Sequence, residues 1–258
     1  RHKVSVGDGG ERALAKALEK GEMPGAVLLA RMPREGELLE HEAVVGNAVV
    51  RPERTPMRRD TIFDLASLTK ALATTTTVLQ LVADGLVDLD DPVAKHLPAF
   101  AERDKESVTI RHLLTHSSGL RPVRFFHEDL LERERKKGER WLGTPEAREW
   151  VVERICKSKL VHDPGEAAVY GDLDFITLGA LVEAVTHEPL DRRCRERIFE
   201  PLGMEDTGFV PLGRSGPRDP DPRHRARAAA TEHCEWRDRI LQGEVHDPNA
   251  WVMGGVAG

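Results

Sequence analysis

The sequence predicts an α+β protein, with an antiparallel sheet flanked by helices and a mainly helical insertion. Two apolar segments, 25–32 and 38–50, flank a polar turn and follow an amphipathic segment, which is typical of a helix beside a β-hairpin. The stretch from 63 to 200 then repeats helical spacing and helix-end signals. We therefore expect a sheet domain formed by 1–62 and 231–258 and a helical domain over 63–230.

The first elements follow from local patterns. Residues 11–20 (ERALAKALEK) are predicted to be helical, because Leu14 and Leu18 are four apart and Gly21 can end the helix. Residues 25–32 (GAVLLARM) and 38–50 (LLEHEAVVGNAVV) are predicted to pair as strands across a turn.

The clearest helix is predicted over 67–84, where apolar residues recur at i, i+3 and i+4 and Gly85 follows. Four threonines at 74–77 lower its helix propensity, so packing must hold it. Thr144 and Pro145 open another helix that runs to about Lys157. Further helices are expected at 109–115, 172–186 and 190–199, a solvated face or loop at 132–140, and an exposed loop at 213–228.

The composition is that of a folded, water-soluble protein. Of 258 residues, 40% are hydrophobic and 32% charged, and the apolar runs fall far short of the ~20 residues that span a bilayer. A net charge of -6 argues against nucleic acid as the main partner. Cys156, Cys194 and Cys234 form no CxxC pair, so neither a disulfide framework nor a zinc site is indicated. Free thiols favour the cytoplasm, with the periplasm after removal of a signal segment as the alternative.

Ser67-Leu68-Thr69-Lys70 is the first candidate for chemistry. A serine hydroxyl becomes nucleophilic when a neighbouring base takes its proton, and spacing i, i+3 on a helix places Lys70 on the same face as Ser67. The start of a helix also favours developing negative charge. The alternative is a helix N-cap serine followed by a solvated lysine.

Tyr170-Gly171-Asp172 is the second candidate, because it precedes the helix predicted at 172–186. A tyrosine there can relay a proton between nucleophile and leaving group. The alternative for Tyr170 is a half-buried core aromatic residue. Asp172 is expected to serve as the N-cap of that helix in any case.

The sequence gives less support to a metal site or to other catalytic motifs. His112 and His116 are four apart, which suits zinc, but neither HExxH nor a third ligand is visible, so helix-end capping and packing are favoured and no metal or cofactor is expected. Glu40, Glu42, Glu166 and Asp174 show no partner in the sequence. The chain contains neither G-x-S-x-G nor a glycine-rich phosphate loop.

Together these stretches resemble the serine β-lactamase and penicillin-binding-protein superfamily, in its branch of class C β-lactamases, D-Ala-D-Ala carboxypeptidases and esterases. The similarity runs from about residue 10 to the end, in the expected order. The similar segments are PGAVLLA (24–30), TIFDLASLTKALATT (61–75), LVDLDDPVAKHLP (86–98), VTIRHLLTHSSGL (108–120), PGEAAVYGDLDFITLGALVE (164–183), RIFEPLGMEDTGF (197–209) and EVHDPNAWVMGGVAG (244–258).

The resemblance implies a serine hydrolase that acts through an acyl-enzyme on an ester, amide or β-lactam bond of a small molecule or peptide, at a site between two domains. It implies Ser67 as nucleophile, Lys70 as its base or proton shuttle and Tyr170 as second general acid/base. The Ser67 N–H would form half of the oxyanion hole. The alternative is a catalytically inactive fragment or binding protein, and an exposed sheet edge would allow oligomers.

Two departures from the family pattern stand out. Asp172 occupies the asparagine place of the usual Tyr-x-Asn box, and an ionised carboxylate only accepts hydrogen bonds. It is expected to contact substrate, but to bind an acylamide carbonyl poorly. The third box, Lys-Thr-Gly or His-x-Gly, is not found; Arg214-Ser215-Gly216 lies in a polar loop. We therefore expect the last sheet strands and the C-terminal helix to be missing from this chain.

Overall fold

The computed structural model describes residues 6–34, 37–138, 140–211 and 222–256. The helices are α1 (Val6–Glu19), η1 (Lys70–Thr75), α2 (Thr76–Ala83), α3 (Val93–His96), η2 (Pro98–Ala101), α4 (Ile110–Leu114), α5 (Phe126–Lys137), α6 (Pro145–Cys156), α7 (Leu173–Thr186), α8 (Leu190–Cys194), η3 (Arg195–Phe199), α9 (Pro222–Arg227) and α10 (Pro248–Val252). The strands are β1 (Gly25–Arg34), β2 (Glu37–Val49), β3 (Thr55–Pro56), β4 (Ala230–Cys234) and β5 (Arg239–Gln242).

The chain folds into two compact units. The sheet unit comprises Arg1–Asp64 and Pro220–Glu244, and the helical unit comprises Leu65–Asp219 and Val245–Gly258. The expected domain boundaries differ from this division at two segments. Residues 245–258 belong with the helical unit, because the Asn249 side chain on α10 is hydrogen-bonded to the backbone of 124–127 at the start of α5. Residues 220–230 belong with the sheet unit, where Ala228 pairs with Ile62.

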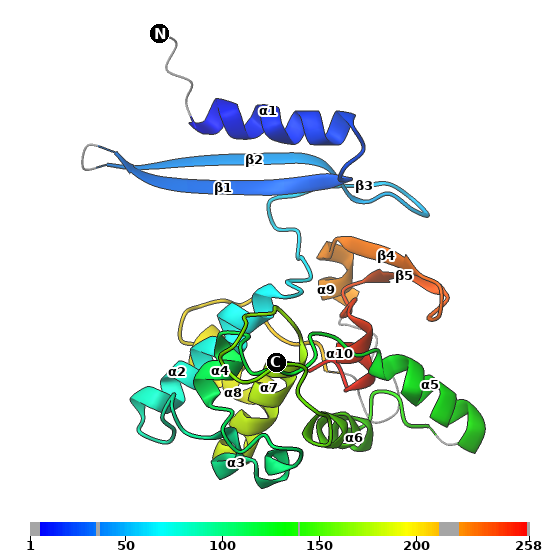
Figure 1. The fold of residues 1–258 in the computed structure, drawn as a ribbon. Helices are drawn as coiled ribbons and strands as arrows, with labels where there is room; N and C mark the ends of the chain where they lie inside the picture. Colours follow the sequence, from blue (N-terminus) through cyan, green and yellow to red (C-terminus); the bar gives the residue numbers. More distant parts are fainter. Residues whose placement is uncertain (1–5, 35–36, 139, 212–221, 257–258) are drawn as a thin grey trace. The chain divides into compact units, whose positions relative to one another are not determined.

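The sheet unit is built on the predicted hairpin. β1 and β2 run antiparallel, from Gly25 opposite Gly46 to Arg34 opposite Glu37, and β3 pairs with β2. Helix α1 lies along this hairpin and contacts both strands (Figure 1). The predicted helix and both predicted strands are therefore confirmed. β4 and β5 form a second, two-stranded antiparallel sheet.

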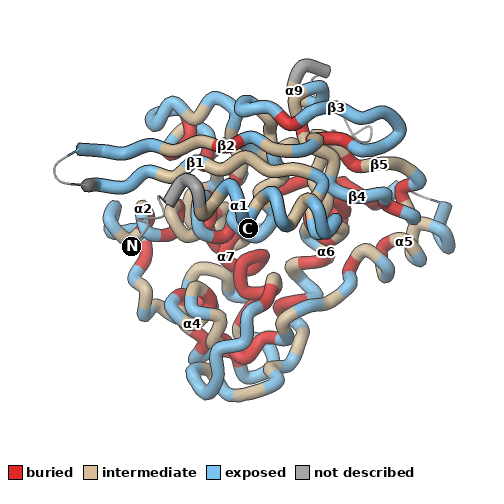
Figure 2. The backbone as a smooth tube through the Cα atoms, turned by 90° about the horizontal axis from the view of Figure 1, so that it is seen from above, coloured by how far each residue is buried: buried red, intermediate tan, exposed pale blue. Residues whose placement is uncertain are grey.

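The helical unit is organised around α7. Apolar residues are distributed around all faces of this helix, and a helix with that pattern is stable only when neighbours cover it. It contacts η1, α2, α3, α4, α6 and α8. Figure 2 shows buried backbone gathered in this unit, whereas the β1–β2 hairpin is largely intermediate or exposed.

The helices predicted at 109–115, from Thr144, at 172–186 and at 190–199 are all present, the last as α8 followed by the π-helix η3. The Thr144 hydroxyl accepts a hydrogen bond from the Ala147 N–H at 3.2 Å, as expected of an N-cap. The charged run lies mostly on α5, with acidic residues in the first turn and basic residues in the last, an order that suits the helix dipole.

The prediction for residues 213–228 was wrong. The segment expected as an exposed loop at 213–228 contains the short helix α9, and Arg214, Ser215 and Gly216 lie outside the described residues. Long-range contacts hold the end of α9: the Ile62 N–H donates to the Arg227 carbonyl at 2.9 Å, and the Arg227 side chain donates to the Asp60 carbonyl. Such contacts leave no local signal in the sequence.

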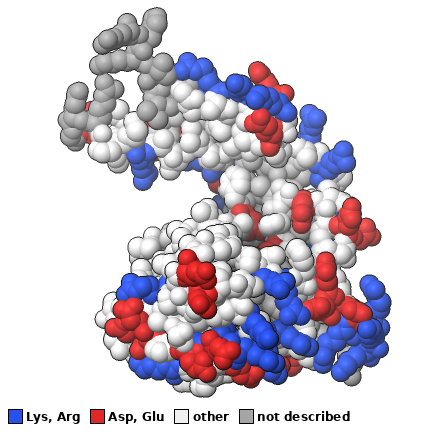
Figure 3. Space-filling view, viewed as in Figure 1, with Lys and Arg blue, Asp and Glu red and all other residues white. Residues whose placement is uncertain are grey.

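Charged side chains of both signs are interspersed over the helical unit (Figure 3). Many of them form ion pairs, such as Arg148 with Glu183 and Arg111 with Asp90. Within the described ranges, every helix is too short or too polar to cross a membrane.

Candidate active site

Ser67 lies in a tight turn that leads directly into the helix carrying Lys70. The N–H groups of Thr69 and Lys70 donate to the carbonyls of Ala66 and Ser67, both at 3.1 Å. Ala66 has a φ of 45°, a left-handed conformation that costs roughly 1–2 kcal/mol for a residue with a Cβ atom. The fold therefore holds a strained residue immediately before Ser67 and leaves Ser67 itself exposed.

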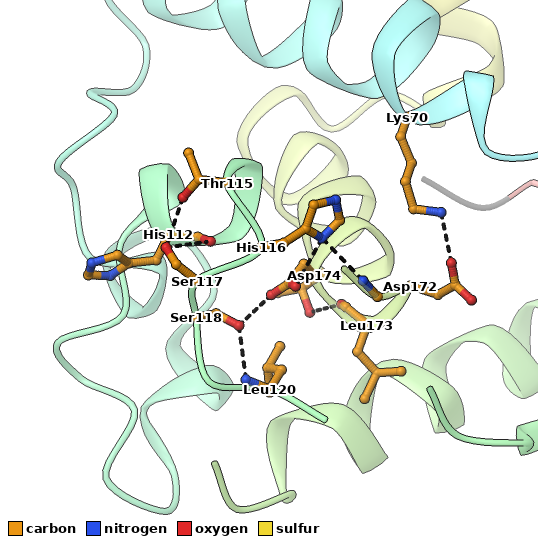
Figure 4. Close-up of polar contacts among 12 residues, drawn as sticks. Lys70, His112, Thr115, His116, Ser117, Ser118, Leu120, Asp172, Leu173 and Asp174 are labelled. Atoms are coloured by element: carbon orange, nitrogen blue, oxygen red, sulfur yellow. Dashed lines mark hydrogen bonds and ion pairs between the residues drawn. The ribbon is translucent and has the colours of Figure 1, made fainter. Parts of the chain in front are cut away.

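Lys70 is the centre of the site. It is buried, with 8% of its surface exposed, and its Nζ donates to Ser67 Oγ at 3.3 Å and to Asp172 Oδ1 at 2.7 Å. The rings of Tyr170 and Phe175 lie 5.4 and 5.8 Å from the same Nζ, close enough for cation–π attraction. The i, i+3 spacing does place Lys70 against Ser67, and Figure 4 shows the Lys70 side chain reaching toward Asp172.

Two loop segments, 116–122 and 161–172, are joined by four backbone hydrogen bonds of 2.8 Å. They run from the N–H groups of Val161, Gly165, Val169 and Asp172 to the carbonyls of Gly119, Ser117, His116 and Pro122, respectively. These bonds fix the backbone on both sides of Tyr170. The second half of the site is thus held by a segment that precedes it by about fifty residues.

Tyr170 is 60% exposed, so the expectation of a half-buried core residue does not describe it. One face of its ring packs against the His116 ring, with centroids 4.6 Å apart and planes tilted by 52°. In the described part of the chain, its hydroxyl makes no hydrogen bond. That hydroxyl is therefore available to a group that enters the site.

Asp172 occupies the N-cap position of α7, but the expected capping hydrogen bond is absent among the described residues. Its side chain turns to Lys70 instead, and its second oxygen, Oδ2, accepts no hydrogen bond from a described residue. In the bond with the ammonium group both partners are charged, whereas a backbone N–H donor is neutral. This difference explains why the carboxylate contacts Lys70 and not the end of the helix. Asp172 therefore belongs to the site rather than to the helix end.

A buried polar cluster lies behind Tyr170. His116 Nδ1 accepts a hydrogen bond from the Gly171 N–H at 3.4 Å, and Asp174 Oδ2 lies 3.4 Å from the same nitrogen. Asp174 is 3% exposed, and the Ser118 hydroxyl donates a short hydrogen bond to its Oδ1 (Figure 4). This cluster connects the first turn of α7 to the loop that carries Tyr170.

The titration of this cluster follows from its burial. Burial raises the pKa of Asp174 to about 7, against a lowering effect of the Ser118 hydrogen bond. Burial, and then the positive charge of Lys70, lower the pKa of His116. Because the Gly171 N–H can only donate, Nδ1 of His116 must be unprotonated, and a protonated Asp174 supplies the hydrogen between the two side chains. Below about pH 7 the proton of the pair therefore lies on Asp174.

Gly171→Ala is expected to lower the rate of Ser67 acylation by about 10²-fold, because small misplacements of catalytic groups cost that much. A Cβ atom at Gly171 would lie 2.4 Å from both the Cα and the carbonyl oxygen of Pro122, so the backbone between Tyr170 and Asp172 must shift. The measurement is the labelling rate of Ser67 by a fluorophosphonate. Gly208→Ala is the control, since a Cβ atom there meets nothing within 4 Å; equal rates in both variants would contradict the prediction.

His112 and His116 serve different purposes. His112 Nδ1 accepts the Thr109 N–H at 3.2 Å while the Thr109 hydroxyl accepts the His112 N–H, which forms a capping box at the start of α4. His116 belongs to the buried cluster. Capping and packing, the expected roles, are confirmed. Among the described residues, no group of three or more side chains is arranged to hold a metal ion.

The structure brings all four predicted site residues together from two segments: Ser67 and Lys70 from one, Tyr170 and Asp172 from another, about a hundred residues later. The supporting roles of His116, Ser118 and Asp174 were not predicted from the sequence. The only signal for them was the segment HLLTHSSGL, which places polar residues directly after a short helix.

Several known proteins resemble this chain. A curated relative from Salmonella schwarzengrund (strain CVM19633), named "Putative D-alanyl-D-alanine carboxypeptidase", is 33% identical over 219 residues, which are 77% of this chain and 47% of the relative. The chain thus spans about half the length of the curated relatives it matches.

Solved structures of a penicillin-binding protein homologue and of simvastatin synthase are also similar to this chain. The octameric penicillin-binding protein homologue from Pyrococcus abyssi is 25% identical with a TM-score of 0.67, over 98% of this chain and 53% of that chain. Simvastatin synthase (LovD) from Aspergillus terreus is 30% identical with a TM-score of 0.62, over 90% of this chain and 58% of that chain. The model of the Beta-lactamase family matches residues 11–248. The chain therefore belongs to the β-lactamase family of serine hydrolases, with the fold that its sequence predicts.

Proposed function

We propose that the protein hydrolyses a small-molecule or peptide substrate through an acyl-enzyme formed on Ser67. One observation carries this proposal: a single buried ammonium group, Lys70 Nζ, contacts the Ser67 hydroxyl, the Asp172 carboxylate and the Tyr170 ring. A nucleophile, a proton acceptor and a group that stabilises the protonated acceptor are therefore in contact. Family membership favours this activity and gives no support to an inactive chain.

In the proposed reaction, the ammonium group of Lys70 first gives one proton to solvent, and the resulting amine takes the proton of Ser67 while Oγ bonds to the substrate carbonyl carbon. Asp172 stabilises the ammonium group that this transfer creates. Within this proposal, the Ser67 N–H, which donates to no described residue, stabilises the oxyanion from the start of the helix.

The tetrahedral intermediate then collapses, and the bond between the carbonyl carbon and the leaving group breaks. The proton on Lys70 passes through the Tyr170 hydroxyl to the leaving group. Water next attacks the acyl-enzyme and gives up one proton along the same route. Ser67 regains its hydrogen, and the acyl group leaves as a carboxylic acid.

Asp172 favours esters over acylamide-bearing substrates within this proposal. Substrate carbonyls need a hydrogen-bond donor, and an ionised carboxylate offers none. Its negative charge also repels a substrate carboxylate at short range. We therefore propose ester cleavage as the main activity, and β-lactam or peptide cleavage as the weaker one.

The test is the intact mass of the protein before and after treatment with a fluorophosphonate and, separately, a penicillin. We expect one fluorophosphonate adduct per chain that is lost in Ser67→Ala and retained in Ser107→Ala, a change at an exposed serine. Faster labelling by the fluorophosphonate than by the penicillin would support ester chemistry. An adduct that survives in Ser67→Ala, or no adduct in the wild type, would refute Ser67 as the nucleophile.

A further inference from the structure

The carboxylate of Asp172 has one oxygen, Oδ2, that is not used in its contact with Lys70. Lys70 Nζ donates to Oδ1 at 2.7 Å, while Oδ2 receives no hydrogen bond from any described residue. The side chain is 33% exposed, in contrast to 11% for Lys70. Figure 4 shows the bond from Lys70 to one of the two carboxylate oxygens. The other oxygen, Oδ2, is therefore an acceptor on a partly exposed side chain.

The position of this acceptor limits what can bind to it. Ser67 Oγ and the Asp172 carboxylate contact the same ammonium group, so an acyl group attached to Ser67 begins only one ammonium group away from Asp172. A substituent that meets the carboxylate must therefore sit within a few bonds of the scissile carbonyl. It must also donate a hydrogen bond, because the carboxylate only accepts.

The charges around Asp172 determine whether a neutral or a positively charged donor binds best to Oδ2. Lys70 and Asp172 compensate each other, and His116 behind Tyr170 is neutral, since its Nδ1 accepts a hydrogen bond from Gly171. A cation bound at Oδ2 thus gains a charge-assisted hydrogen bond with a partly exposed carboxylate. An anion there would be repelled.

The flanking side chains are apolar and exposed. Leu68 follows Ser67 and Val169 precedes Tyr170, with 59% and 38% of their surfaces exposed. They suit the hydrocarbon part of an acyl group, whereas Asp172 suits its polar substituent.

We propose that Asp172 selects acyl groups that carry a free, protonated amine close to the scissile carbonyl, so that the preferred substrates are esters of amino acids with an unblocked amine. This inference rests on the proposed acylation of Ser67. Asp172 then has two roles: Oδ1 holds Lys70, and Oδ2 binds the substrate ammonium group.

The test compares three thiobenzyl esters: alanine, with an α-ammonium group; isobutyrate, with a methyl group in its place; and N-acetylalanine, with an acylamide. Both enantiomers of alanine are assayed at about pH 6.5, below the α-amine pKa of about 7.7–8. For one enantiomer we expect kcat/KM to exceed that of isobutyrate by about tenfold or more, as one charge-assisted hydrogen bond allows.

Asp172→Asn is expected to lower the alanine-to-isobutyrate ratio about tenfold, by the loss of one charge-assisted hydrogen bond, and to improve N-acetylalanine relative to both. The ratio isolates binding, because the effect of the variant on Lys70 slows all three esters alike. Glu166→Gln removes the same charge from an exposed site in the same loop and should leave the ratio unchanged.

A wild-type ratio near one, or a ratio that Asp172→Asn does not alter, would overturn the ammonium site. Failure of all three esters, together with no fluorophosphonate adduct, would instead refute the acylation of Ser67, so the two failures are distinguishable.

Discussion

Lys70→Met is expected to slow the acylation of Ser67 by roughly 10²–10⁴-fold, the usual contribution of a general base. Methionine matches the length of the lysine stem but can neither accept the Ser67 proton nor bind Asp172, so both contacts of Nζ disappear at once. The measurement is the rate constant of fluorophosphonate labelling and of thiobenzyl ester cleavage. We expect both to fall together.

The stability of the same variant separates a catalytic role from a structural one. Lys70 is a buried cation, and replacing a buried ion pair member with an apolar residue of similar volume avoids the cost of desolvating the ammonium group. Asp172 is partly exposed and can be solvated when its partner is gone. The Tm should therefore change little while the rate collapses. Lys136→Met, at an exposed lysine paired with Glu132, is the control. A labelling rate equal to wild type would exclude Lys70 as the base.

Local patterns were sufficient for much of the fold. The hairpin follows from two apolar segments around a polar turn, and α6 follows from Thr144 and Pro145, because both signals act between residues a few positions apart. The pairing of Ser67 with Lys70 was predictable for the same reason, since three residues separate them on one helix.

The rest of the site depends on contacts between distant segments. Asp172 was expected to cap α7, and the local pattern favours that choice, but the ammonium group of Lys70, 102 positions earlier, competes for the carboxylate and wins. His116 and Asp174 are 58 positions apart, and neither shows a partner in the sequence. Their roles appear only when the loops 116–122 and 161–172 are joined in the fold.

The pair His116 and Asp174 leads to the largest expected change in stability. Asp174 has a pKa of about 7 in the folded protein because it is buried, against about 3.9 when unfolded. Between these values the folded state binds more protons, so Asp174 alone makes the free energy of unfolding fall as pH rises from about 4 to 7, by about 4 kcal/mol in all. For His116, burial and Lys70 lower the pKa, so the folded state binds fewer protons. Its contribution therefore rises with pH up to about 6.5.

In the wild type, the contributions of Asp174 and His116 to the pH dependence of the free energy of unfolding have opposite signs. Between about pH 4 and 6.5, the folded state holds one proton on Asp174, whereas the unfolded state holds one on His116. His116→Gln is expected to leave the falling slope of Asp174, since the raised pKa comes from burial and not from the histidine. Asp174→Asn is expected to leave the rising slope of His116. Urea unfolding at half-unit steps from pH 4.5 to 7.5 measures both slopes.

Opposite slopes in the two single variants would show that the folded state holds a proton on Asp174 and none on His116 Nδ1, because a purely structural loss would lower both curves without tilting them. His233→Gln, at an exposed histidine, controls for the removal of an imidazole. Lys70, Asp172 and His162 also act on the pair through their charges and stay in place in both variants. Parallel curves for the two variants would show that the proton does not lie on Asp174. The cluster behind Tyr170 would then be held by ordinary neutral hydrogen bonds and packing.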